Sequence, residues 1–194
     1  MADRINPRTQ RVRDALKAAT IELVSKKPVS EISITEIAVT ANVSRPSVYK
    51  QFNDMPTLVA DTTIEVMNEI FADIDKNLKV GDDLEYLTKH MEMLTKGLYK
   101  HRKFLKNAIY SSAEPIIIDA AVKDLCNRMR DRLVGRTLVE AGMNVDDCLH
   151  AIAAGMVLLT FRWLNSDFRG ENSPTNMGDR IAKTIFWISG VQRV

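Results

Sequence analysis

A run of polar and cationic side chains, SRPSVYK, occupies residues 44–50. It brings together two hydroxyls, a guanidinium, a phenol and an ammonium group, carried by Ser44, Ser47, Arg45, Tyr49 and Lys50. Such groups donate hydrogen bonds to phosphate oxygens, and arginine and serine can also reach the edges of bases. A segment that only packed inside a core would not need this face. The run therefore indicates contact with a polyanion.

Two short helical patterns position this run. Ser33 followed by Glu36 is a capping box, which opens a helix with apolar residues on its inner side. That helix ends at Asn42, a residue type that tolerates a left-handed backbone. Ser44 is expected to cap the next helix, with Pro46 in a first turn that needs no amide donor.

Two helices joined by so short a turn predict a helix-turn-helix. The second helix is short enough to enter the DNA major groove, which is roughly 12 Å wide. Val48 and Phe52 would anchor its inner side and leave the polar run facing outward. A tight helical corner with a merely solvated face is the alternative.

The rest of the chain also follows helical periodicity. Gly and Pro are scarce, at 8 and 6 of 194 residues, which disfavours a strand-rich fold with many turns. No segment alternates with period two over the length of a strand. We therefore expect an all-α fold of about nine helices, with later helices over residues 58–78, 84–99, 104–110, 115–141, 146–164 and 174–191.

Charge is unevenly distributed. Residues 1–52 hold nine basic and five acidic side chains, a net charge of +4, whereas the remainder holds 18 basic and 20 acidic ones, a net charge of −2. A basic N-terminal quarter favours a polyanionic partner at one end of the molecule. A basic face that is only solvated would give the same count.

We expect a cytoplasmic protein without disulfides or a membrane span. The two cysteines are too few for a disulfide framework. The polar, basic start of the chain is not typical of a secretory signal. No stretch approaches the length of about 20 apolar residues that a span requires.

An enzyme is not expected. The three histidines are scattered, and no metal-binding, phosphate-binding or nucleophile motif occurs. Asp82-Asp83 and Asp146-Asp147 are typical of helix starts and not of a paired acid–base site. We therefore expect no catalytic residues, no metal and no cofactor.

The sequence resembles the tetracycline-repressor (TetR) family of bacterial transcription regulators in two stretches, RVRDALKAATIELV and SITEIAVTANVSRPSVYKQFNDMPTLV. The family pattern has Ser or Thr opening the second helix, then Ile-Ala, Ala-Gly-Val-Ser, and a Tyr and a Phe three apart. Three residues depart from the usual pattern: Asn42 replaces Gly, Pro46 stiffens the second helix, and Met55 stands where many members have Lys. The later elements RWLNSDF and SPTNM resemble the family's C-terminal domain more loosely.

The resemblance implies two domains, with DNA binding in residues 1–54 and ligand binding and dimerisation in residues 55–194. The predicted contacts with double-stranded operator DNA are Ser33, Thr35, Ser44, Arg45, Ser47, Tyr49 and Lys50. It also implies a homodimer, and small or apolar residues suit that interface at Ala151, Ala154, Gly155, Leu158, Ile181, Ile185 and Ile188. The same residues would also suit the internal core of a monomer.

A pocket for a small apolar or amphipathic effector is implied as well. Pliable, aromatic or polar side chains on the helices that would line it are Met67, Phe71, His90, Met93, Tyr110, Arg128, Met129 and Met156. Plain core is the alternative for each of these residues. The sequence thus predicts a dimeric repressor of a palindromic operator that an effector releases. The alternative is a helix-turn-helix protein that acts as an activator or as a ligand-free interaction module.

Overall fold

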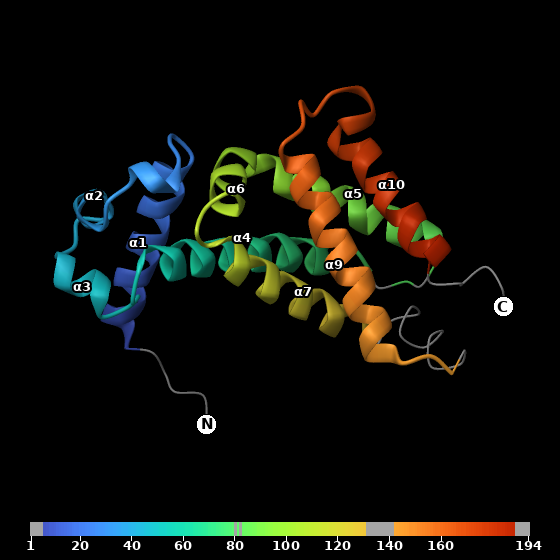
Figure 1. Ribbon diagram of the computed structural model, residues 1–194, viewed down its shortest axis with the longest axis horizontal. Coiled ribbons are helices and arrows are strands. Elements are labelled where there is room, and N and C mark those ends of the chain that lie inside the picture. Colours follow the sequence, from blue (N-terminus) through green and yellow to red (C-terminus); the bar gives the residue numbers. More distant parts are fainter. Residues whose placement is uncertain (1–5, 80, 82, 131–141, 189–194) are drawn as a thin grey trace. The chain divides into compact units, whose positions relative to one another are not determined.

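The computed structural model describes residues 6–79, 81, 83–130 and 142–188, without the side chain of Ile188. Throughout these residues every regular element is helical and none is a strand, so the predicted all-α class is confirmed (Figure 1). Nine α-helices lie within them: α1 (Pro7–Val24), α2 (Ile34–Thr40), α3 (Arg45–Tyr49), α4 (Met55–Asn77), α5 (Leu84–Lys100), α6 (Arg102–Ile109), α7 (Glu114–Arg130), α9 (Val145–Leu164) and α10 (Pro174–Ile188). The part of the predicted helix over 131–141 lies outside the described residues.

The chain divides into two compact units. Unit 1 comprises Met1–Glu65 and Lys103–Ile117, and unit 2 comprises Val66–Arg102 and Ile118–Val194. The boundaries between them fall inside α4 and α7 and after the first residue of α6. The division of function predicted between residues 54 and 55 stays a prediction.

Side chains cap two helices of unit 1 where the sequence predicted caps. The hydroxyl of Ser33 accepts the backbone N–H of Glu36 at 3.1 Å and begins α2. The carboxylate of Glu36 forms an ion pair with Lys27 at 2.9 Å. Asp54 accepts the N–H of Thr57 at 2.8 Å at the start of α4. A cap of this kind contributes about 1 kcal/mol to stability.

The turn after α2 has the geometry that Asn42 suggested. Asn42 has φ of 51°, in the left-handed region. Its N–H bonds to the carbonyl of Val39 at 3.1 Å, and the N–H of Val43 bonds to the carbonyl of Ala38 at 2.9 Å. This pair of bonds is a Schellman motif, which ends a helix and satisfies carbonyls that have no helical partner. The motif turns the chain sharply from α2 into α3.

Unit 1 holds α1 against α4 by two ion pairs. Arg13 contacts Asp61 at 2.7 Å, and Lys17 contacts Glu65 at 2.9 Å. The guanidinium of Arg13 also lies 5.1 Å from the ring centre of Phe52, the buried residue that follows α3. Arg13 in α1, before α2 and α3, thus contacts Phe52 and Asp61, which follow these two helices in the chain.

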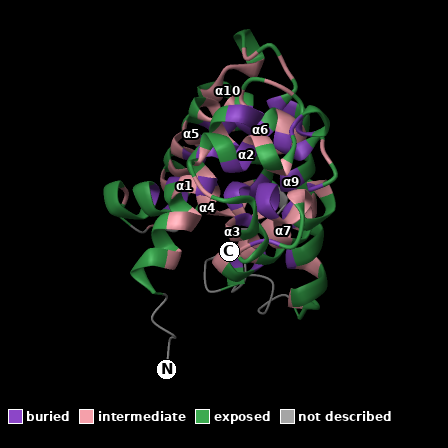
Figure 2. Cartoon of the chain, turned by 90° about the vertical axis from the view of Figure 1, so that its left-hand side faces the viewer, coloured by how far each residue is buried: buried purple, intermediate pink, exposed green. Residues whose placement is uncertain are grey.

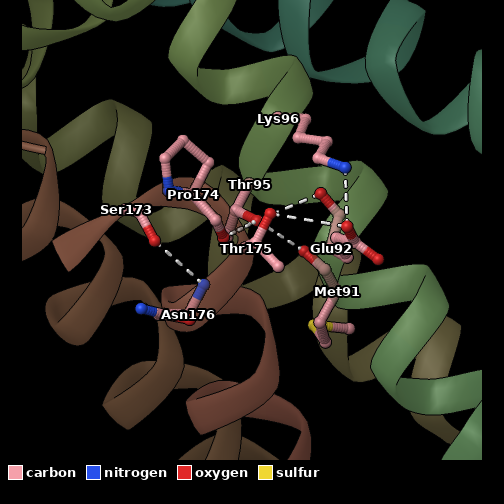
Figure 3. A network of polar contacts seen from close by, with 8 residues as sticks. All are labelled: Met91, Glu92, Thr95, Lys96, Ser173, Pro174, Thr175 and Asn176. Atoms are coloured by element: carbon pink, nitrogen blue, oxygen red, sulfur yellow. Dashed lines mark hydrogen bonds and ion pairs between the residues drawn. The ribbon is translucent and has the colours of Figure 1, made fainter. Parts of the chain in front are cut away.

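Unit 2 is built on close packing of α10 against α5 (Figure 1). Gly178 permits the approach, because a Cβ there would lie 2.7 Å from the Cα of Glu92. The buried hydroxyl of Thr95 lies 2.7 Å from the carbonyl oxygen of Pro174, and Thr175 contacts Glu92 at 3.4 Å (Figure 3). Side-chain contacts therefore join α5 to the first turn of α10.

The connection from α9 to α10 is held by aromatic contacts. The ring of Phe168 meets those of Tyr99 and Trp163 edge-on, at centroid distances of 5.1 and 5.2 Å. Phe168 has φ of 58°, which is uncommon for a residue other than glycine. The indole N–H of Trp163 donates to the carbonyl of Asn172 at 2.7 Å.

Helix α9 corrects one expectation from the sequence. By length and composition alone it is long and apolar enough to cross a membrane, so the statement that no stretch reaches this limit is wrong. Six of its residues are nevertheless buried inside unit 2. The two faces of the helix differ, with buried residues on one side and exposed ones on the other (Figure 2). This is the pattern of a helix in a bundle, with one outer face that is also apolar.

Candidate nucleic-acid interface

Helix α3 presents a polar outer face on an apolar anchor. Val48 is fully buried and Phe52 is nearly so, as predicted, and together they fix the inner side of the helix. Arg45, Tyr49 and Lys50 are exposed. A guanidinium, a phenol and an ammonium group therefore point to solvent from α3 and the residue that follows it.

Arg45 and Tyr49 are paired on this face. The guanidinium Nη2 donates to the Tyr49 hydroxyl at 3.3 Å, and its carbon lies 5.7 Å from the centre of the phenol ring. The spacing of four residues places the two side chains next to each other on a helix. Sequence reasoning treated them as separate contacts.

The prediction that the Ser44 hydroxyl caps α3 is wrong. Ser44 occupies the N-cap position, but its side chain makes no capping bond to the backbone. Its hydroxyl lies 2.8 Å from the hydroxyl of Ser47 instead. The backbone N–H of Ser47 bonds to the Ser44 carbonyl at 2.8 Å, so the turn closes without the side chain.

The remaining predicted residues, Ser33 and Thr35, are also exposed and lie at the start of α2. Ser33 already accepts the capping bond from Glu36, and its hydroxyl proton remains available to an acceptor. All seven predicted residues thus fall in one continuous helix-turn-helix segment. The structure exposes six of them and leaves Ser47 half-buried.

Ion pairs divide the basic residues of the segment 6–52 into two groups. Arg13, Lys17, Lys26 and Lys27 bind carboxylates of the chain itself. Among the described residues no ion pair involves Arg8, Arg11, Arg45 or Lys50, and none of these four is buried. Arg8 and Arg11 were counted in the basic quarter but not assigned as contacts. The sequence did carry a signal that these two arginines lack a carboxylate partner within the described residues. Both lie in the first turns of α1, ahead of any acidic residue in that helix.

Comparison with known proteins gives a fold match and no sequence match. No protein-family model matches the sequence, and no curated protein matches it. Among solved structures, AlkX from Dietzia sp. strain DQ12-45-1b, a TetR family repressor implicated in biodegradation of n-alkanes, matches with a TM-score of 0.64. The match has 14% identity and covers 100% of this chain and 99% of that one. The chain has the TetR-family fold.

Two further solved structures match over most of the chain. FadR from Bacillus halodurans, a fatty acid degradation regulator, has a TM-score of 0.65 at 15% identity, over 94% of this chain and 96% of that one. NalD, the secondary repressor of the MexAB-OprM multidrug efflux pump in Pseudomonas aeruginosa, has a TM-score of 0.59 at 20% identity, over 93% and 96%. The predicted resemblance is confirmed at the level of the fold.

Within the TetR-family fold, three of the eight predicted effector residues meet in unit 2. The guanidinium of Arg128 stacks 3.9 Å from the ring centre of Phe71, and the rings of Phe71 and His90 are 6.4 Å apart. His90 also lies 3.3 Å from the hydroxyl of Tyr86. Asp124 contacts Arg128 at 2.6 Å, so a carboxylate of the chain already matches its charge.

The other five predicted effector residues differ in their burial and in the unit to which they belong. Met129 and Met156 are buried, Met67 and Met93 are half-buried, and the exposed Tyr110 belongs to unit 1. An open cleft of about 630 Å³ lies over the start of α5, but none of the eight residues lines it. The prediction of an effector pocket at these residues is not tested by the described part of the chain.

Predicted dimer residues fall on both faces of their helices. Ala151, Gly155 and Leu158 are exposed on α9, and Ala154 is half-buried. Ile181 and Ile185 are buried within unit 2, because this face of α10 packs inside the chain. The side chain of Ile188 lies outside the described residues.

The described residues hold no group of three or more His, Cys, Asp or Glu side chains arranged as metal ligands. Burial raises the pKa of the Cys126 thiol, which disfavours the reactive thiolate.

Proposed function

We propose that this protein is a homodimeric transcriptional regulator that represses by binding palindromic operator DNA through α3. The observation that carries the proposal is the outer face of α3, where Arg45, Tyr49 and Lys50 are exposed above a buried anchor. A helix placed in this way can enter the major groove while the preceding helix crosses the backbone. Exposed cations without a carboxylate partner supply the attraction to phosphate.

The strength of binding should depend steeply on salt. Each phosphate contact that releases a counterion contributes about 0.9 to the slope of log affinity against log salt. We expect Lys50→Ala to weaken binding to all sequences alike and to lower that slope by about 1. Fluorescence anisotropy with a labelled duplex at four salt concentrations measures both. Lys183→Ala, which removes a lysine paired with Asp179 on α10, is the matched control.

We further propose that α9 forms the dimer interface. Leu158 and Leu159 are 57% and 42% exposed on its outer face, and a Cβ on Gly155 would meet nothing within 4 Å. The outer face of α10 instead carries the Lys183–Asp179 ion pair, with exposed Trp187 near its end. Exposed apolar faces on soluble proteins mark interaction sites, and two-fold pairing is the commonest arrangement.

Sedimentation velocity tests the interface. Leu158→Asp should convert the dimer to a monomer, because each copy would bring a carboxylate into the apolar contact. Ile116→Asp makes the same kind of change at a residue of α7 that is 42% exposed, against 57% for Leu158, and should leave the dimer intact. Equal behaviour of the two variants would contradict an interface on α9.

The effector is proposed to be a small apolar or amphipathic molecule bound in unit 2 near Phe71, His90 and Arg128. The polar groups of Arg128 and His90 lie against the ring of Phe71, and this combination is typical of ligand sites. A compound that binds should raise the thermal midpoint and release DNA. His90→Phe keeps the ring and removes its polar nitrogens, and should abolish the response while DNA binding persists.

A further inference from the structure

The pair formed by Arg45 and Tyr49 is placed on the surface that the proposed function assigns to DNA. Both side chains are exposed, and Tyr49 is 47% accessible. The contacts between Arg45 and Tyr49 are not needed to hold the fold, since Val48 and Phe52 supply the buried anchor. The pair therefore restrains the orientation of an outward-facing guanidinium.

The pairing leaves most of the donors of Arg45 available. A guanidinium carries five N–H groups in a rigid fork, and Tyr49 receives only one of them, from Nη2. No carboxylate binds Arg45 within the described residues, in contrast to Arg13, whose Nη2 is held by Asp61. The charge and the second edge of the fork remain free to face a partner.

We infer that Tyr49 is a positioning residue for Arg45, and that the pair selects a guanine in each half of the operator. Guanine presents two acceptors, O6 and N7, to the major groove, and an arginine fork can bond both at once. A guanidinium already held against a phenol ring loses less side-chain freedom when it binds. The ring also favours the cation within about 6 Å of its centre. This inference rests on the proposed DNA-binding function.

The role differs from that of a tyrosine that only touches phosphate. A phosphate contact carries no sequence information, so its loss weakens every site by the same factor. Loss of a positioning contact weakens binding to the guanine-containing site more than binding to the same site with that base pair replaced. The ratio of the two affinities separates these roles, whatever the loss of overall affinity.

The experiment begins with selection of binding sites by the wild-type protein from random duplex DNA. Affinities are then measured for the selected duplex and for the same duplex with the preferred guanine·cytosine pair changed to adenine·thymine. The proteins compared are wild type, Arg45→Ala, Tyr49→Phe and the double variant. Tyr99→Phe, the same chemical change at a half-buried tyrosine of α5, and Lys50→Ala are the controls.

We expect Tyr49→Phe to reduce the preference for guanine about fivefold, the scale of one net hydrogen bond. Arg45→Ala should remove the preference, and adding Tyr49→Phe to it should change the preference no further. Both controls should keep the wild-type ratio. Because Tyr49→Phe retains the exposed ring, circular dichroism should show an unchanged fold.

Three outcomes overturn the inference. The first is a Tyr49→Phe protein that binds both duplexes more weakly by one factor, which would make Tyr49 a phosphate contact. The second is additive loss of preference in the double variant, which would make the two residues independent. The third is a selected site with no guanine that depends on Arg45. A wild-type protein that selects no sequence instead defeats the proposed function itself, and the inference with it.

Discussion

The close approach of α10 to α5 makes Gly178→Ala a sharp test of the packing in unit 2. The new Cβ would lie 2.7 Å from the Cα of Glu92, 2.8 Å from its N and 2.9 Å from the carbonyl carbon of Met91. Ordinary carbon contacts are about 3.5–4.0 Å long, so α10 must move away by about 1 Å. All three atoms belong to the backbone, and no change of rotamer can relieve the contact.

The expected cost combines two terms of opposite sign. Overpacking of this kind costs about 3 kcal/mol, at the upper end of the usual range, because helix backbone cannot yield locally. Alanine regains about 1 kcal/mol over glycine through its helix propensity. The free energy of unfolding should therefore fall by about 2 kcal/mol, which lowers the thermal midpoint by about 4–8 °C for a chain of this size.

Urea unfolding followed by circular dichroism, at one fixed protein concentration, measures this change. Gly97→Ala provides a graded control, because its Cβ would meet the side chain of Ile70 at 2.6 Å and not backbone. A side chain can shift, so this variant should lose less than Gly178→Ala. A Gly178→Ala protein as stable as wild type, or more stable, would refute the packing described here.

Three further measurements follow from single contacts. Thr95→Val keeps the shape of a buried residue but removes a hydroxyl 2.7 Å from a carbonyl in the first turn of α10, so unfolding should become easier by about 1 kcal/mol in urea. Asp54→Ala should cost about 1 kcal/mol at neutral pH. Hydrogen bonds from Thr57 lower the pKa of Asp54 from 3.8, so its contribution is present above that value and is lost as the pH falls through the lowered pKa. The difference from the variant should therefore shrink in acid, and a gap that persists at pH 2 would contradict this. In Trp163→Phe, emission from the remaining tryptophan, Trp187 on the outer face of α10, should stay constant as protein concentration rises through dimer formation on α9, whereas a shift to shorter wavelength would place α10 in the interface.

The parts of the fold that depend on neighbouring residues could be predicted from the sequence. The caps at Ser33 and Asp54 and the left-handed Asn42 each involve partners within five positions along the chain. The buried side of α3 followed from its spacing in the same way. Local side-chain chemistry and periodicity decide such features, and both are visible in a sequence.

Features that depend on packing between distant segments were not predictable in the same way. The periodicity of α10 marked Ile181 and Ile185 as apolar but not whether a partner copy or α5 would cover them. The ion pairs of Arg13 and Lys17 join residues 48 positions apart, so the basic N-terminal quarter overstated the charge open to DNA.

Side-chain orientation was the other gap. The polar groups of α3 were identified by type, but the sequence did not show that the Ser44 and Ser47 hydroxyls bond to each other. Nor did it show that Arg45 rests on Tyr49, because a spacing of four allows a contact without requiring one. The close packing of α10 against α5 likewise depends on Gly178, whose role appears only in three dimensions.

The central claim is that α3 reads DNA as part of a two-fold dimer. Selection of binding sites by the purified wild-type protein from a random duplex pool, at near-physiological salt, tests it most directly. The account predicts recovery of an inverted repeat whose half-sites lie about one helical turn, or a multiple of one, apart. Recovery of no preferred sequence would contradict it, and would show that the segment from Ser33 to Phe52 is a helical corner and not a reader of DNA.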